Sequence, residues 1–404
     1  MQKQKVPLAP VIGCLLSQLC VGVVYLWSVF RADAMTYFHW ALSPANLVSS
    51  FMVFGFCAGS FAGGALNVRF GAKRISLLGI ALFCAGLLSS SLLPQGTKPV
   101  LFYLTYCTLG GIGVGFTFNS GLFCLQSWFP HRRGFASGLG TAAFGLGSVV
   151  FSPVISTLLR EMTISATLRV LAAGVAVVGF GSCLLIRAPG KDYLAALPHT
   201  EHSATDAARD MPFREAFRTM PFWCMVGGLF FYNAAWNVLT PLVKGLGIAR
   251  GLSQSAAVVC VSLTGVFNAA GRLVMSTLSD RLGRIRTVYV LSGITTVCAL
   301  LLTFIGGAGY FATALLTVFA FGGPAAVFPA ACTDLFGQKY SGTNYGFGML
   351  ALGLSSIVFN AVSNALFTAT GAYVASFLVC AASALLTVVF YAIIQRCLKK
   401  GFNR

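Results

Sequence analysis

The chain has 404 residues, of which 57% are hydrophobic and only 9% are charged. A soluble domain carries about 25% charged residues, because its surface must be hydrated. The composition therefore excludes a single soluble domain. Because the chain also contains repeated apolar runs of roughly 20 residues or more, it is predicted to be an all-α membrane protein with many spans.

Twelve apolar segments are long enough to cross a bilayer as helices. Six precede a polar stretch at residues 188–219 and six follow it. We therefore predict two six-helix bundles, at residues 1–187 and 220–404, joined by this linker. The predicted spans are 8–30, 44–68, 74–94, 99–128, 133–158, 166–187, 220–245, 253–281, 286–306, 309–336, 342–368 and 371–396.

The end of the linker has its own amphipathic pattern. Phe213, Phe217 and Met220 recur at helical spacing, with Arg214 and Arg218 between them. This pattern suits a short helix in the membrane interface. It suits the first turns of the seventh span equally well, and the sequence leaves both interpretations open.

The charge balance is a topology signal. The chain has 27 Lys and Arg against 9 Asp and Glu. Twenty of the cations fall in the linker, at the two ends of the chain and in the loops on their side, whereas six fall in the opposite loops. The excess of cations in cytoplasmic loops of membrane proteins predicts that the linker and both termini are cytoplasmic. A nucleic-acid partner is not needed to explain the charge.

The two halves of the chain repeat each other. The loop around Gly71 resembles the loop around Gly283, 212 positions later. A second pattern recurs at an offset of 208 positions, from span five to span eleven. Paired halves are typical of alternating-access transporters, whose substrate binds between the halves. The second pattern consists of Gly134, Gly138, Gly145 and Phe151, then Gly342, Gly346, Gly353 and Phe359.

Several stretches resemble a known family. The loops Gly64–Arg74 and Ser279–Arg286 resemble the signature loops of the major facilitator superfamily. Four further regions resemble its oxalate:formate antiporter family, which includes bacterial monocarboxylate transporters. The resemblance implies the major facilitator fold, a monomer and a bacterial inner-membrane location. The four regions are Gly22–Phe30, Trp128–Gly134, Phe267–Arg272, and Asp334–Gly337 with Asn344–Gly346.

The resemblance also implies gating loops on the cytoplasmic side. Two positions depart from the family pattern, because Val68 and His131 stand where the family commonly has Asp. Gate ion pairs of the N-terminal half are therefore not carried over. The residues that match the gating loops are Arg69, Gly71, Asp280, Arg281, Gly283 and Arg284.

Arg272 is the one cation that falls in the middle of a predicted span. An Arg at the centre of a membrane helix costs about 2.5–3.5 kcal/mol on insertion scales, so such residues are usually functional. None of the nine acidic residues lies at the middle of a span to pair with it. Because a guanidinium matches a carboxylate in bidentate geometry, we predict that Arg272 binds the carboxylate of a substrate rather than a buried acid.

Other residues are predicted to line the same cavity. Asn268 lies one helical turn before Arg272 and can orient the guanidinium by a hydrogen bond. Packing of a small polar residue between helices explains Asn268 equally well. By resemblance to the family, the cavity is also lined by Tyr25, Phe118, Phe321, Met349 and Leu352.

Leu352 indicates the valence of the substrate. Dicarboxylate-exchanging members of the family have a Lys at this position, and one remaining cation matches one carboxylate. The sequence therefore predicts a transporter of monocarboxylates such as lactate, pyruvate, propionate or formate. Oxalate:formate exchange is the alternative. No carboxylate lies in the path, so exchange or facilitated diffusion is favoured over proton symport. No cofactor, metal site or catalytic group is predicted.

The topology is testable at residue 200 of the linker. Thr200→Cys, in a background without exposed native Cys, should resist a membrane-impermeant thiol reagent in intact cells and react after lysis, because the basic side of the protein faces the cytoplasm. Rapid labelling of this Cys in intact cells would contradict the predicted orientation.

Overall fold

The computed structural model describes residues 6–190, 192–193 and 210–401, and these residues form an all-helical fold. Ten described helices are long and apolar enough to cross a membrane, and a bent pair at the start of the chain gives an eleventh candidate. The predicted all-α membrane class is confirmed. The rest of the linker, at residue 191 and residues 194–209, lies outside the described part.

The helices follow the predicted spans closely. The N-terminal half contains α1 (Leu8–Val21), η1 (Gly22–Leu26), α2 (Trp27–Phe38), α3 (Leu42–Phe70), α4 (Ala72–Ser91), α5 (Pro99–Phe102), η2 (Tyr103–Gly110), α6 (Gly111–Trp128), α7 (Arg133–Glu161) and α8 (Ile164–Leu185). The C-terminal half contains α11 (Phe213–Ala216), α12 (Met220–Tyr232), α13 (Ala234–Leu239), η3 (Thr240–Leu242), α14 (Val243–Ala249), α15 (Gln254–Leu282), α16 (Arg284–Leu301), α17 (Gly307–Phe336), α18 (Ser341–Thr370) and α19 (Val374–Lys399).

The first and seventh spans are broken. The first bends by 42° between its two helical parts and continues to Phe38, so the predicted end at residue 30 is wrong. The seventh is divided among α12, α13, η3 and α14. Pro241 lies in η3, and a proline has no N–H for the helical hydrogen bond. Corresponding helices of the two halves are thus interrupted, as the internal repeat implies.

The end of the linker forms a separate short helix, α11, before α12 begins at Met220. The end of the linker is therefore separate from the seventh span, and its location in the membrane interface stays a prediction. The helix packs against the bundle through Phe213, whose ring lies 5.3 Å from that of Phe61 on α3 and 5.4 Å from that of Phe347 on α18. One side chain therefore contacts both halves of the protein.

The repeated loops share one backbone conformation. Gly71 has φ 82° and ψ 156°, and Gly283 has φ 87° and ψ 147°. This region is accessible essentially to glycine alone, because a Cβ would clash with the backbone. The repeat detected in the sequence is therefore also a repeat of local structure.

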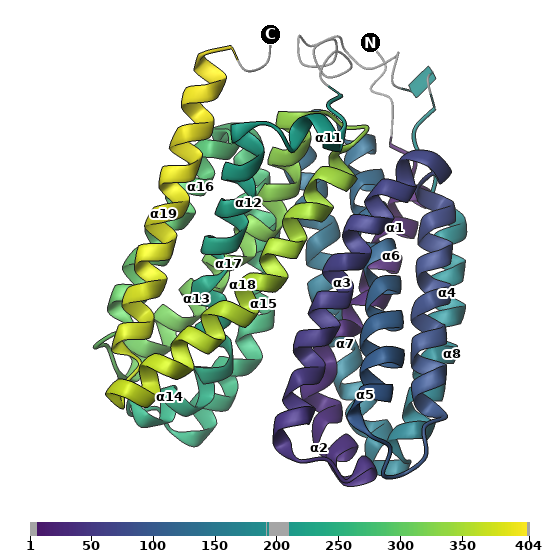
Figure 1. Ribbon diagram of the computed structural model, residues 1–404, viewed down its shortest axis with the longest axis vertical. Helices are drawn as coiled ribbons and strands as arrows, with labels where there is room; N and C mark the ends of the chain where they lie inside the picture. Colours follow the sequence, from purple (N-terminus) through teal and green to yellow (C-terminus); the bar gives the residue numbers. More distant parts are fainter. Residues whose placement is uncertain (1–5, 191, 194–209, 402–404) are drawn as a thin grey trace.

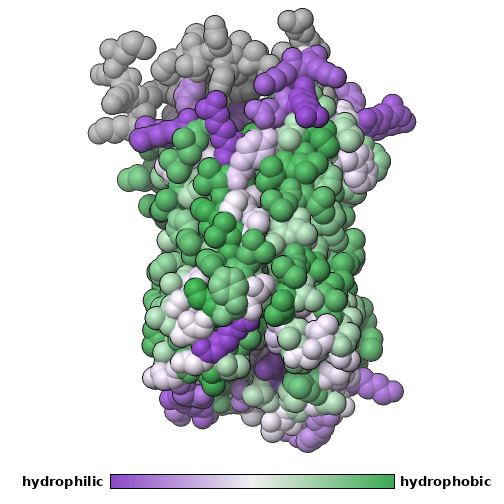
Figure 2. All heavy atoms as spheres, turned by 90° about the vertical axis from the view of Figure 1, so that its left-hand side faces the viewer, coloured by the Kyte–Doolittle hydropathy of each residue, from purple (hydrophilic) through white to green (hydrophobic). Residues whose placement is uncertain are grey.

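Figure 1 shows two helical bundles side by side, with the start of α1 and the end of α19 at the same end. We name this end the basic end, since it carries the loops with Lys73, Arg133 and Arg284. The opposite end, with turns at Gly96 and Gly251, is named the far end. Figure 2 shows a broad apolar band between hydrophilic residues at both ends, as expected for a bilayer-spanning surface.

The halves are joined at the basic end and separate toward the far end. One buried apolar cluster includes residues of both halves, among them Leu122 of α6 and Met349 of α18. A second cluster contains residues of the C-terminal half alone, such as Leu239 and Phe359. The ribbons of the two halves likewise diverge toward the far end (Figure 1). The structure is therefore closed at the basic end.

The repeated glycines lie along this closed contact. A Cβ at Gly138 of α7 would lie 2.7 Å from the carbonyl oxygen of Arg272 on α15. A Cβ at Gly346 of α18 would lie 2.7 Å from both the Cα of Phe61 and the carbonyl oxygen of Ser60 on α3. Real Cβ atoms do not approach so closely. The two rows therefore let α7 meet α15 and α18 meet α3 at backbone distance, and we name these contacts the glycine seam.

Widening the glycine seam should open the basic end. Gly346→Ala should hold α3 and α18 apart, because overpacking a close contact costs about 1–3 kcal/mol. Spin labels at Val68 and Lys339 should then show a larger population at long distance. Gly174→Ala is the matched control, since a Cβ at Gly174 meets no atom within 4 Å. An unchanged distance distribution in Gly346→Ala would contradict this role of the seam.

Candidate substrate site

Arg272 lies on α15 at the contact between the two halves. Its side chain is buried, with 5% of the residue surface exposed. Its Nε donates a hydrogen bond to Oδ1 of Asn268 at 2.7 Å, and its Nη1 donates to the carbonyl oxygen of Thr141 on α7 at 2.8 Å. Gly145 of α7 adjoins the guanidinium, since a Cβ there would lie 3.7 Å from Cζ, at van der Waals distance. The predicted hydrogen bond between Asn268 and Arg272 is present.

The charge of Arg272 is not balanced by a described carboxylate. The described ion pairs all lie at the basic end and involve Asp280 or Asp334. Within residues 6–190, 192–193 and 210–401, the hydrogen bonds of Arg272 use Nε and Nη1 and leave Nη2 without one. Two carbonyl-type oxygens orient the cation without neutralising it. The guanidinium therefore retains both its charge and a donor for an anion.

Phe321 lies on α17, one position before the contact of this helix with the backbone of α15 at Arg272. The next residue, Gly322, packs against α15, where a Cβ would lie 2.9 Å from the backbone nitrogen of Arg272. The ring of Phe321 stacks on Trp236 of α13, with centroids 4.4 Å apart and planes 5° from parallel. Trp236 was not predicted as a site residue. Its position in the interrupted seventh span was the available signal, because broken helices line the substrate sites of many transporters.

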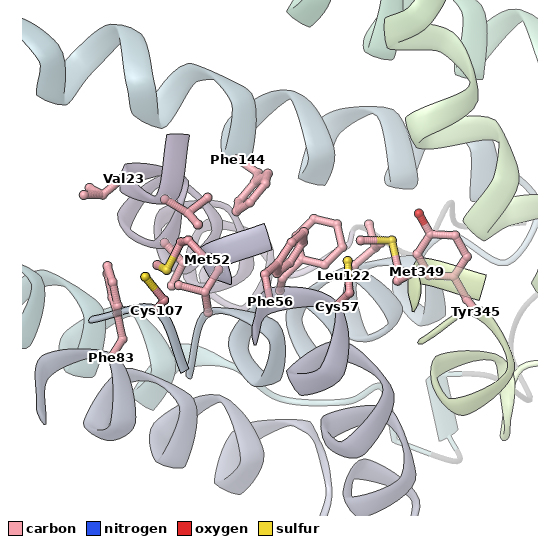
Figure 3. Packing of buried hydrophobic residues seen from close by; sticks show 14 of the residues in the cluster. Val23, Met52, Phe56, Cys57, Phe83, Cys107, Leu122, Phe144, Tyr345 and Met349 are labelled. Atoms are coloured by element: carbon pink, nitrogen blue, oxygen red, sulfur yellow. The ribbon is translucent and has the colours of Figure 1, made fainter. Parts of the chain in front are cut away.

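Phe118 and Met349 are core residues. Phe118 of α6 packs against Phe56 and Phe144, at centroid distances of 5.1 Å and 4.8 Å, and is 4% exposed. Met349 belongs to the buried cluster that both halves share, and Figure 3 shows it between Tyr345 of the same helix and Leu122 of α6. Neither side chain has a described contact with Arg272. The sequence resemblance located their helices without showing which way the side chains point.

Leu352 and Tyr25 complete the predicted set. Leu352 is half-buried on α18 and packs against the shared core. Tyr25 lies on η1, at the break in the first span, and its side chain is outside the described part of the structure. The structure thus brings Arg272 and Asn268 together, whereas Phe321 and Leu352 are half-buried residues that pack against the shared core.

An ion network closes the basic end. Arg284 of α16 donates from Nε to Oδ2 of Asp334 on α17 at 2.8 Å and contacts Oδ1 of Asp280 at 2.7 Å. Asp334 also pairs with Arg133 of α7 at 3.0 Å. Asp280 accepts hydrogen bonds at 2.8 Å from the backbone N–H groups of Gly134 and Phe135, at the start of α7. A carboxylate is favourable at a helix N-terminus, so this contact adds to the closure.

The residues of the predicted gating loops therefore differ in their contacts. Asp280 and Arg284 join the network, whereas Arg69 and Arg281 are exposed and have no ion pair with a described acid. The sequence analysis missed the pairing of Arg133 with Asp334. Both residues lie within stretches that resemble the family, but a contact between positions 201 apart leaves no local pattern.

Two helical bundles that meet at one end, with a buried cation on their boundary, define a membrane transporter of the alternating-access class. The comparisons with known proteins agree with this class. Residues 12–360 match the Major Facilitator Superfamily model. The chain belongs to the major facilitator superfamily and is a secondary transporter, not an enzyme.

Individual relatives are distant. The chain is 28% identical to an "Oxalate:formate antiporter" of Oxalobacter formigenes, over 86% of this chain and 81% of the relative. It is 26% identical to "Apicoplast pyruvate carrier 1" of Toxoplasma gondii, over 83% and 79%. The solved proton:xylose symporter XylE superposes with a TM-score of 0.77 over 95% of this chain and 94% of that one, at 17% identity, which confirms the fold.

Proposed function

We propose that this protein transports small monocarboxylates by alternating access, through exchange or facilitated diffusion. The observation that carries the proposal is the buried guanidinium of Arg272, which lies between the halves and has no described acidic partner. In a low-dielectric site such a cation favours an anionic ligand. The names of the two relatives, one an oxalate:formate antiporter and one a pyruvate carrier, support a carboxylate substrate.

The orientation follows from the charge distribution. We propose that the basic end faces the cytoplasm of a bacterial cell and that the protein works as a monomer in the inner membrane. The described state then admits substrate from the far end, where the halves separate. The carboxylate would bind Nη2 of Arg272 and draw the guanidinium away from the carbonyl of Thr141.

Transport then requires the basic end to open. This step separates α7 from α15 and breaks the contacts of Asp280 and Asp334 with the start of α7. In the empty protein the hydrogen bond from Arg272 to Thr141 resists the separation. This difference favours exchange over slippage of the empty carrier. Proton symport is the alternative, in which the substrate's own carboxyl carries the proton.

Removal of the guanidinium should abolish transport. Arg272→Ala should eliminate counterflow of labelled lactate in proteoliposomes without a pH gradient, while the yield of folded monomer stays close to wild type. Arg272→Lys should also lose at least about tenfold in activity, because a compact ammonium does not reproduce the planar fork of Arg. Near-normal counterflow by Arg272→Ala would contradict the proposed site.

The second candidate function is oxalate:formate exchange, which the name of the first relative favours. The two candidates differ in the charge of the substrate, because oxalate is a dianion and the monocarboxylates are monoanions. The described site offers one cation, and a dianion would leave one charge poorly compensated. Wild-type protein should therefore bind lactate or formate more tightly than oxalate, measured by competition for labelled substrate. Leu352→Lys should shift this preference toward oxalate, and Leu352→Met is the matched uncharged control. A wild-type preference for oxalate would favour the second candidate.

A further inference from the structure

A cavity of about 720 Å³ lies at the basic end of the N-terminal half and shares no lining residue with the candidate substrate site. α1 and α8 meet at Gly13, where a Cβ would lie 2.7 Å from the carbonyl oxygen of Ser182. The cavity lies on the basic side of this contact, between the start of α1 and the end of α8. Its wall includes Pro7, Pro10, Lys73, Trp128, Leu184 and Arg187.

Two cations line this cavity without an acid beside them. Lys73 and Arg187 are exposed, and within residues 6–190, 192–193 and 210–401 neither side chain has an ion pair or a hydrogen bond. The described wall contains no Asp or Glu. The carbonyl oxygen of Arg187 accepts a hydrogen bond from Nε1 of Trp128 at 2.7 Å. The side chain of Arg187 therefore extends from a backbone position that is anchored to the end of α6.

The corresponding cavity of the C-terminal half has a different charge. It measures about 360 Å³ and lies between the start of α16 and the ends of α17 and α19. Its two cations, Arg284 and Arg286, lie with Asp334 on the same wall, and Arg284 also pairs with Asp280. In the N-terminal half Val68 occupies the position that Asp280 occupies 212 residues later. Two carboxylates thus offset the cations of one cavity, whereas the cations of the other remain uncompensated.

The N-terminal cavity also borders the apolar surface. Leu184 and Leu185 on its wall are 59% and 42% exposed, and Leu8, between two lining residues of α1, is 74% exposed. Exposed leucines at the end of a membrane span face lipid chains rather than water. An occupant that contacts both regions needs an anionic head and a hydrocarbon tail.

We propose that this cavity binds an anionic phospholipid, with the phosphate between Lys73 and Arg187 and the acyl chains along Leu184 and Leu185. Basic pockets between membrane helices are suited to anionic lipid headgroups. The cavity volume lies within the range of about 300–1,000 Å³ that is typical of ligand sites. Because the two cations belong to α4 and to the chain that leaves α8, the bound lipid connects these two segments of the N-terminal bundle.

Native mass spectrometry of the purified full-length protein, titrated with dioleoylphosphatidylglycerol or dioleoylphosphatidylcholine, tests the proposal. The first bound phosphatidylglycerol should have an apparent Kd at least about fivefold lower than the zwitterionic lipid, whose ammonium group opposes the two cations. Lys73→Gln combined with Arg187→Gln should abolish this preference, with phosphatidylcholine changed less than about twofold. Lys399→Gln combined with Lys400→Gln is the matched control, because it removes the same charge from exposed positions of the basic end outside both cavities.

Competition distinguishes a lipid from a soluble phosphate compound. Glycerol 3-phosphate, which has a phosphate group without acyl chains, should not displace phosphatidylglycerol at equal concentration, and displacement would overturn the lipid site. Equal affinities of the two lipids for the wild-type protein would overturn it, as would an equal loss of preference in both double variants. If the Lys73 and Arg187 double variant does not fold, Arg187→Gln alone should lower the preference, and an unchanged preference there would overturn the proposal.

Discussion

The charge of Arg272 inside an apolar bundle is the constraint on which the central architecture depends. A guanidinium cannot lose its proton at physiological pH, so its charge must be stabilised where it lies. Asn268 and the carbonyl of Thr141 provide part of this stabilisation, and the second of these contacts crosses from one half of the protein to the other. The residue at the centre of the candidate site therefore also joins the two halves.

The hydrogen bond from Arg272 to Thr141 requires α7 and α15 to lie close together. A backbone carbonyl can reach the guanidinium across the boundary only where α7 and α15 approach without an intervening side chain, and Gly138 removes one that would obstruct them. Gly346 of α18 likewise lets this helix approach the backbone of α3. In a membrane, where lipid tails are as apolar as side chains, small residues and interhelical hydrogen bonds are the main means of joining helices. The glycine seam thus closes the basic end through many modest contacts, which a conformational change can break in sequence.

The ion network adds a different kind of closure. Asp334 keeps 37% of its side chain exposed while it pairs with Arg133 and Arg284, so water weakens these bonds relative to buried ones. Exposed pairs of this kind can be exchanged for hydration when the end opens. The network and the glycine seam lie on the same side of Arg272. Arg272 and Asp280 of α15 therefore both contact α7, one at the candidate site and one at the basic end.

Composition and hydropathy alone determined the all-helical membrane class, nearly all span positions and the internal repeat, since these depend on local polarity and on spacing along the chain. The position of one uncompensated Arg in a span likewise identified the centre of the candidate site. The burial of Phe118 and Met349, the break at η1 and the stacking of Trp236 on Phe321 required the tertiary structure. Side-chain direction in an apolar helix has no clear periodic signal when protein, lipid and cavity all contact it. The bond from Arg272 to Thr141 joins positions 131 apart through a backbone carbonyl, which every residue possesses. Only the packing of α7 against α15 decided which carbonyl the cation would meet.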